Sequence, residues 1–235
     1  MKRKNILFAA TAMFSLLLFV FLMIRSAKNI TLETNALPSK PLPQILIDPG
    51  HGGEDGGAVS GEVLEKEINL DISHDTADLF TLFGFDVSMT RTTDDALTSE
   101  GEDVKKRKYN DMKMRLDMYN SSDDNVIISI HQNKFSSTAS NGTQVFYSPN
   151  HGQSGQLARC IQFSVKKLLQ PENERECKAA GSEIFLLKNT QNPAVLVECG
   201  FISNKSEREK LLDKEYQKEM ALSIVTGFID YFNTN

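Results

Sequence analysis

NVIISIH, residues 125–131, is an almost unbroken apolar run that ends in a histidine. A run of this length, rich in β-branched residues, is typical of a strand that is buried on both faces, as in the parallel sheet of an α/β protein. Similar short apolar runs occur at 44–48 and 194–201. We therefore predict a sheet whose central strands are fully buried.

The segments around these strands alternate between strand-like and helix-like patterns. Further strands are expected at 85–90, 143–148 and 183–187, and helices at 65–83, 109–119, 154–169, 206–212 and 215–232. This alternation predicts an α/β fold, a single domain with a mixed, mostly parallel sheet flanked by helices. In such folds the sites lie outside the carboxyl ends of the strands, which directs attention to His51, His131 and Glu198.

The first 25 residues differ in character from the rest of the chain. Three basic residues precede an uncharged apolar run over 6–24, and this run approaches the ~20 residues that cross a bilayer. It is longer than a usual signal core and no clean cleavage site follows, so we expect residues 1–25 to be an uncleaved membrane anchor rather than a removed signal. The basic end is expected to stay in the cytoplasm, which predicts an exported, membrane-anchored protein.

The remaining chain divides into a linker and one domain. Residues 26–43 are polar and carry three prolines in LPSKPLP, a composition that predicts an extended tether. Residues 44–235 suit one domain with a full core. The net charge is −5 and the basic residues are scattered, so no nucleic-acid partner is expected. The three cysteines show no CxxC spacing, which excludes a cysteine zinc site and a disulfide framework.

The stretch LIDPGHGGEDGGAVSG, residues 46–61, follows the first predicted strand and is rich in glycine. Glycine in this position suggests a phosphate-binding loop, but the stretch fits neither the Walker pattern nor the dinucleotide pattern. The acidic residues Glu54 and Asp55 would also repel an anion. We therefore interpret His51 as a metal ligand, and we expect the glycines to leave room for a polymer to approach.

A hydrolytic zinc site needs three protein ligands, often two histidines and a carboxylate. His131 can join His51 at the same edge of the sheet. The carboxylate best placed to face them is Glu65, at the start of the helix expected over 65–83, although acids are favoured at helix N-termini without any metal. The other two histidines, His74 and His151, are expected in a helix and in a turn, away from the site.

Glu198 lies inside the otherwise apolar strand AVLVECGF. A carboxylate in such a strand is costly unless it is paired or functional. Beside a metal it could act as general base and acid, and burial would raise its pKa toward a useful value. The structural alternative is a buried salt bridge with Arg91 or Arg115.

Four segments together carry a resemblance: LIDPGHGGEDGGA, LEKEINL, SIHQN and VLVECGFISN. In this order they resemble the zinc-dependent N-acetylmuramoyl-L-alanine amidases of the amidase_3 family, over nearly all of 44–232. The resemblance implies one zinc ion (Zn2+) per chain, bound by His51, Glu65 and His131, with Glu198 as the catalytic glutamate. It implies hydrolysis, in peptidoglycan, of the amide that joins the lactyl group of N-acetylmuramic acid to L-alanine. Asn133 and Arg91 are implied as substrate-binding residues.

A finer resemblance is to the amidases of spore-forming bacteria that act on spore cortex peptidoglycan. It rests on the short anchor, the lack of wall-binding repeats and the polar segment 92–116. It implies a role in forming muramic-δ-lactam, with a deacetylase acting afterwards, in the space between the forespore and mother-cell membranes. An accessory envelope protein is a further candidate partner. Lys134 departs from the small residue of many relatives, which affects substrate contacts near the metal.

Two other functions share these features. A zinc peptidase that cuts within the stem peptide would use the same metal chemistry, and a non-catalytic peptidoglycan-binding module would keep the fold without turnover. The glutamate in an apolar strand argues against the second.

Overall fold

The structure, a computed structural model, describes residues 41–234. The membrane anchor expected at 1–25 lies outside the described residues, as does the expected linker except for 41–43. Within 41–234, no helix is both long enough and apolar enough to span a bilayer.

A six-stranded sheet with the order β4-β1-β5-β8-β6-β7 forms the centre of the described chain. Its strands are β1 (Gln44–Pro49), β4 (Asp86–Met89), β5 (Asn125–Asn133), β6 (Gln144–Tyr147), β7 (Lys178–Ala179) and β8 (Ala194–Phe201). The first four strands in this order run parallel, and β6 joins β8 in the antiparallel direction. The predicted mixed, mostly parallel α/β sheet is therefore confirmed. A separate small hairpin, β2 (Val59–Ser60) with β3 (Val63–Leu64), follows the glycine-rich loop.

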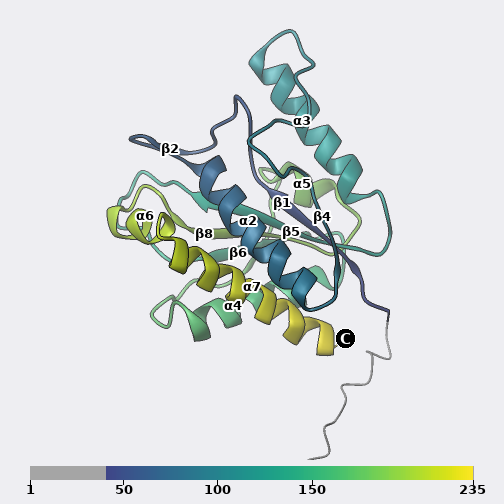
Figure 1. Cartoon of the computed structure of the whole chain (residues 1–235), viewed down its shortest axis with the longest axis vertical. Coiled ribbons are helices and arrows are strands. Elements are labelled where there is room, and N and C mark those ends of the chain that lie inside the picture. Colours follow the sequence, from purple (N-terminus) through teal and green to yellow (C-terminus); the bar gives the residue numbers. More distant parts are fainter. Residues whose placement is uncertain (1–40, 235) are drawn as a thin grey trace, which may run out of the picture. The chain divides into compact units, whose positions relative to one another are not determined.

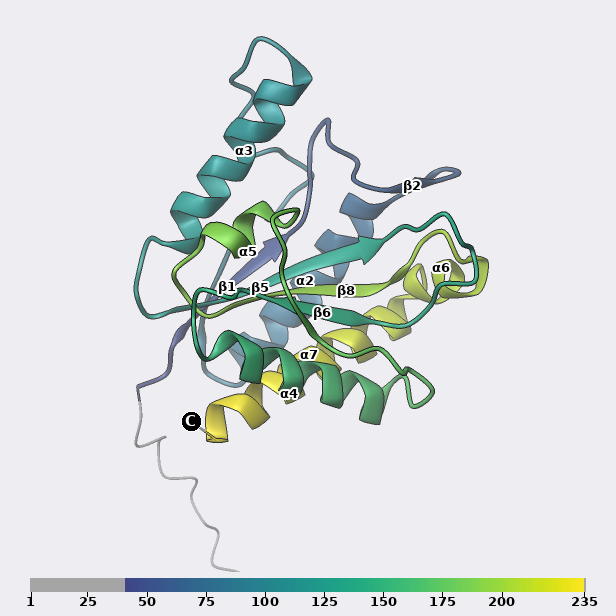
Figure 2. The same ribbon diagram turned by 180° about the vertical axis from the view of Figure 1, so that it is seen from behind.

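The helices lie on both faces of the sheet (Figures 1 and 2). One face is covered by α2 (Glu65–Leu82), α4 (Ser154–Leu168) and α7 (Lys214–Thr234), and the other carries α3 (Val104–Tyr119) and α5 (Phe185–Asn189), while α6 (Lys205–Leu211) packs against β8. Neighbouring residues of one strand serve opposite faces: Ile45 and Ile47 belong to the larger core, and Leu46 belongs to the smaller core beneath α3 and α5. This division explains why the central strands are apolar at every position.

Two elements differ from the sequence-based expectation. Residues 183–187 were expected as a strand, but α5 occupies Phe185–Asn189. A short apolar run has no periodicity that separates a strand from a buried helical turn, and β7 already pairs with the free edge of β6. α3 begins at Val104 rather than at Tyr109, because the side chain of Asp103 caps it by accepting a hydrogen bond from the backbone N–H of Lys106.

Candidate metal centre

The carboxyl ends of β1 and β5 bring the three predicted ligands together. His51 follows β1, His131 lies in β5, and Glu65 is the first residue of α2. One ligand atom from each of these side chains lies within 4.8 Å of the others, and the two imidazole ring centres are 4.9 Å apart. Among residues 41–234 this is the group of histidine, cysteine and acidic side chains whose spacing suits a metal ion.

The glycines of the loop make room for these ligands. A Cβ on Gly50 would lie 2.2 Å from the imidazole of His131. A Cβ on Gly57, whose φ is +69°, would lie 2.7 Å from both the Glu65 carboxylate and the His51 ring. At Gly50 and Gly57 the space is therefore filled by the side chains of the predicted ligands and not left open for a polymer, as the sequence analysis had expected.

Glu65 is held by several donors. Its Oε1 accepts hydrogen bonds from the backbone N–H of Gln132 at 3.0 Å and from Asn69 Nδ2 at 3.2 Å, and it lies 2.9 Å from His131 Nδ1. Its Oε2 accepts a bond of 2.7 Å from the backbone N–H of Ala58. Burial raises the pKa of this carboxyl, but the bonds to the two histidines outweigh burial and hold it well below its usual range. Glu65 is therefore ionised and fixed in place.

His51 is oriented by Asp55. The Nδ1 of His51 lies 2.9 Å from Asp55 Oδ2, and its Nε2 lies 3.3 Å from Glu65 Oε1. Burial lowers the pKa of His51, but the bonds to Asp55 and Glu65 outweigh burial and raise that pKa to about 9. A carboxylate on the far nitrogen is how proteins orient metal-binding histidines. The sequence analysis used Asp55 only as an acidic neighbour, although its position four residues after His51 was a usable signal.

Metal binding at this site is expected to release protons. At pH 8 the carboxyl of Glu198, with a pKa of about 7, is mostly ionised, whereas His51, with a pKa of about 9, is mostly protonated. A metal ligand must be deprotonated, so a metal ion that binds His51 is expected to displace about one proton from it, and to bind more weakly as the pH falls below about 9. Calorimetric titration in buffers of different ionisation enthalpy measures the proton count. Release of no protons at pH 8 would show that the imidazole of His51 is already neutral in the metal-free chain.

Glu198 lies beside the cluster. It is the register partner of His131 in the β5–β8 pair. Its Oε2 is buried and has no hydrogen-bond partner within the described part of the chain. Burial raises the pKa of this carboxyl to about 7. The salt bridge offered as a structural alternative is not found among residues 41–234: Arg115 pairs with Asp48 and Asp111 instead.

The two residues expected to bind substrate differ in placement. Arg91 is 5% exposed, and its guanidinium donates to the backbone carbonyls of Pro49, Gly50 and Lys66. Arg91 therefore holds the backbone of the loop and is not among the residues that line the cavity beside the cluster, while its predicted contact with substrate stays a prediction. Asn133 ends β5 and is half-buried, so substrate binding by Asn133 stays a prediction.

The remaining residues singled out from the sequence lie apart from the cluster. His74 is 3.0 Å from the carbonyl oxygen of Thr92, and His151 accepts a bond from the backbone N–H of Gln153. Lys134 is exposed, and its ammonium donates to the backbone carbonyl of Val59 in the β2–β3 hairpin.

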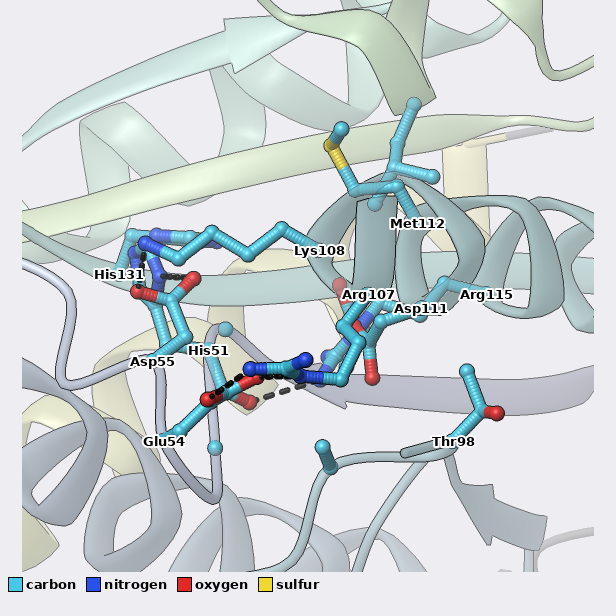
Figure 3. Close-up of a pocket in the computed structure, with 15 residues that line it drawn as sticks. His51, Glu54, Asp55, Thr98, Arg107, Lys108, Asp111, Met112, Arg115 and His131 are labelled. Atoms are coloured by element: carbon cyan, nitrogen blue, oxygen red, sulfur yellow. Dashed lines mark hydrogen bonds and ion pairs between the residues drawn. The ribbon is translucent and has the colours of Figure 1, made fainter. Parts of the chain in front are cut away.

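A cavity of about 180 Å³ opens beside His51 and His131 (Figure 3). Its other walls come from the loop at Ala96 and Thr98, from α3 and from Leu186 of α5. The cavity gives a ligand access to the histidines from the side of the sheet that carries α3.

Comparisons with known proteins agree with this arrangement. A protein-family model, Amidase_3, described as N-acetylmuramoyl-L-alanine amidase, matches residues 45–230. A germination-specific N-acetylmuramoyl-L-alanine amidase of Bacillus subtilis (strain 168) is 36% identical over 189 residues, which cover 80% of this chain and 79% of the relative.

Solved structures give the same result. The CwlD amidase from Clostridioides difficile, solved in complex with the GerS lipoprotein, superposes with a TM-score of 0.79 and 34% identity, covering 82% of this chain and all of that one. An N-acetylmuramoyl-L-alanine amidase from Clostridium difficile 630 superposes with a TM-score of 0.72 and 27% identity, covering 83% of this chain and all of that one. The likeness extends over the sheet and the helices that position the site.

Proposed function

Because this chain belongs to the Amidase_3 family and is an N-acetylmuramoyl-L-alanine amidase, we propose that it holds one zinc ion on His51, Glu65 and His131 and transfers protons through Glu198. The observation that carries the proposal is the juxtaposition of two imidazoles and one carboxylate, all within 4.8 Å, with the buried, unpartnered oxygen of Glu198. Peptidoglycan is the substrate of this activity.

The residues fit zinc by their chemistry. Two imidazole nitrogens and one carboxylate are the donor set of hydrolytic zinc sites, which leave a further position open. His51 has a carboxylate contact that orients its ring, from Asp55, whereas the contact between His131 Nδ1 and Glu65 joins two of the proposed ligands. Without a metal, the bonds between Glu65 and the two histidines hold the cluster together. The site is thus built in advance of metal binding.

The reaction requires a water molecule to add to the carbonyl and the amide C–N bond to break. Zinc, when bound, supplies Lewis-acid chemistry that polarises the carbonyl and lowers the pKa of water. Glu198 takes a proton from the attacking water and delivers it to the leaving nitrogen of L-alanine, which frees the stem peptide and leaves a lactyl carboxylate. A pKa of about 7 suits this group for both directions of transfer near neutral pH.

Zinc analysis of the purified chain tests the metal assignment. We expect about one zinc per chain, and we expect Glu65→Ala and His131→Ala to lose the metal together with activity. His151→Ala serves as the control, because His151 lies in a turn away from the cluster. Mass spectrometry of digested peptidoglycan identifies the bond cut, since only amidase action leaves free lactyl carboxylates. Full zinc content in both ligand variants would refute the assigned site.

We extend the proposal to spore cortex peptidoglycan. The support is the 36% identity to a germination-specific amidase and the likeness to CwlD. Removal of the stem peptide supplies the free lactyl carboxylate that muramic-δ-lactam formation consumes, once a deacetylase has exposed the amine. Muropeptide analysis of cortex from the native host, with and without the gene, tests this role; unchanged muramic-δ-lactam would contradict it.

The location and the partner belong to the same proposal. We infer that residues 1–25 anchor the enzyme outside the cytoplasm, in the intermembrane space of the forming spore, from the basic and apolar pattern of that segment. An accessory envelope protein is supported by the GerS lipoprotein bound to the CwlD relative. Protease accessibility in protoplasts of non-sporulating cells that express the full chain tests export across the membrane, because a cytoplasmic domain would stay protected.

A further inference from the structure

α3 reaches the metal-binding loop although most of the helix stands away from the sheet. Figures 1 and 2 show its N-terminal half extending beyond the rest of the domain. Of its residues only Arg115 and Tyr119 are buried. Three of its side chains, Arg107, Lys108 and Arg115, nevertheless contact the loop that carries His51; Arg107 pairs with Glu54, and the other two reach Asp55 and the backbone of His51 itself. These polar contacts join the loop to a helix that is otherwise mostly exposed.

Lys108 acts on the side chain of His51 through Asp55. Its Nζ donates a bond of 2.7 Å to Asp55 Oδ1, while the other oxygen of Asp55 lies 2.9 Å from His51 Nδ1 (Figure 3). The backbone N–H of Gly57 donates to the same Oδ1 at 3.2 Å. Asp55 is therefore held on one oxygen by two donors and presents the other to the imidazole. Without Lys108, the weaker of these two contacts would be left to fix the carboxylate.

Arg115 acts on the backbone of His51. Its Nη2 donates a bond of 2.7 Å to the carbonyl oxygen of His51, and its Nη1 donates 2.9 Å to the carbonyl oxygen of Pro49. His51 has a φ of +64°, which a residue with a side chain adopts at a cost. The guanidinium holds this conformation by binding the carbonyl that follows it. The neighbouring ion pair with Asp48 anchors Arg115 in turn.

We propose that α3 aligns His51 for metal binding, with Lys108 and Arg115 as positioning residues that act on its imidazole and on its carbonyl. The inference rests on the proposed function, because it takes His51 to be a zinc ligand. Loss of a group that orients a metal-binding histidine directly typically costs 10–100-fold in metal affinity. Lys108 acts one bond further away, so we expect a loss of about 3–10-fold.

Charge alone predicts the opposite result. Removing a positive group near the site would favour a bound cation, so a purely electrostatic Lys108 would make Lys108→Met bind zinc more tightly. Positioning predicts weaker binding. The sign of the change therefore separates the two roles.

The test is a zinc titration of the full chain in competition with a chromogenic chelator. Lys108→Met is expected to bind zinc about 3–10-fold more weakly than the unaltered chain, and Lys108→Arg is expected to recover most of the loss. Lys105→Met is the matched control, since it removes the same charge from an exposed position of the same helix. Thermal melts of the metal-free variants show that each is folded. Arg115→Lys, which keeps the charge but loses the fork that binds two carbonyls, is expected to bind zinc more weakly as well.

Three results would overturn the inference. Lys108→Met could bind zinc as tightly as Lys105→Met or more tightly. It could raise KM at unchanged zinc affinity, which would make Lys108 a substrate contact of the cavity. Failure of the unaltered chain to bind zinc would instead refute the proposed metal site, and the positioning role with it.

Discussion

Replacement of Glu198 by glutamine is expected to lower kcat about 10²–10⁴-fold while about one zinc per chain stays bound. The glutamine keeps the size of the side chain but cannot accept and return a proton. Glu198 is not one of the three grouped ligands, so metal content should survive the change. Turnover of muramyl peptide and metal analysis of the same preparation measure both effects.

Two observations sharpen this test. Glu172→Gln is the control, because Glu172 is exposed, and it should turn over substrate at the original rate.

The pH dependence of stability gives an independent readout. The folded pKa of Glu198 is raised from 4.5 to about 7, so the folded state binds its proton more tightly and the metal-free chain should lose stability as pH rises from about 4.5 to about 7. The glutamine variant should lack this part of the pH dependence. Full activity in Glu198→Gln would remove Glu198 from the mechanism.

Replacement of Arg115 by methionine is expected to lower the free energy of unfolding by about 3–5 kcal/mol. The variant leaves the carboxylate of Asp48 buried without its ionic partner. Asp48 would retain Tyr119 Oη at 2.6 Å, Thr90 Oγ1 at 2.7 Å and Ser129 Oγ at 2.8 Å, which are neutral donors. Urea unfolding of the metal-free chain, followed by circular dichroism, measures the loss.

A second variant distinguishes the buried charge from lost packing. Asp48→Asn combined with Arg115→Met removes both charges, and it should recover part of the stability lost by the single change. Arg159→Met, at an exposed position of α4, should leave the urea midpoint unchanged. The interpretation fails if Arg115→Met alone unfolds at the same urea concentration as the unaltered chain.

The sheet could be predicted from the sequence because its central strands are apolar at every position. Ile127 and Ile128 point to opposite cores. A strand that is buried on both faces has apolar residues at consecutive positions, and such a run is easy to recognise in the sequence. The clustering of the two histidines could be predicted for a related reason: His51 and His131 come at the ends of such strands, where α/β folds place their sites. Glu65 required the family resemblance, since an acid at the start of a helix is common without a metal.

The contacts that hold the ligands could not be predicted. Arg115 and Asp48 are 67 residues apart in the chain, and nothing in the local pattern of either residue indicates the other. Arg91 shows the same difficulty, because a buried arginine that binds backbone carbonyls looks like any other arginine in the sequence. Such pairings depend on how α3 returns to the sheet, which is decided by the tertiary fold.

The register of β5 and β8 places Glu198, the proposed proton carrier, beside His131 of the cluster. His131 and Glu198 are register partners because Ile127 pairs with Ala194 and the pairing continues without a shift through the next four residues of each strand. A slip of β8 by one residue would exchange its faces, yet Val195, Val197 and Leu196 would still meet apolar neighbours. Glu198, however, would enter the larger core as an unpaired charge, at a high cost. The carboxylate therefore also favours the correct register, because its burial would raise the free energy of a sheet in which β8 is shifted by one residue. The apolar residues alone would not distinguish the two registers.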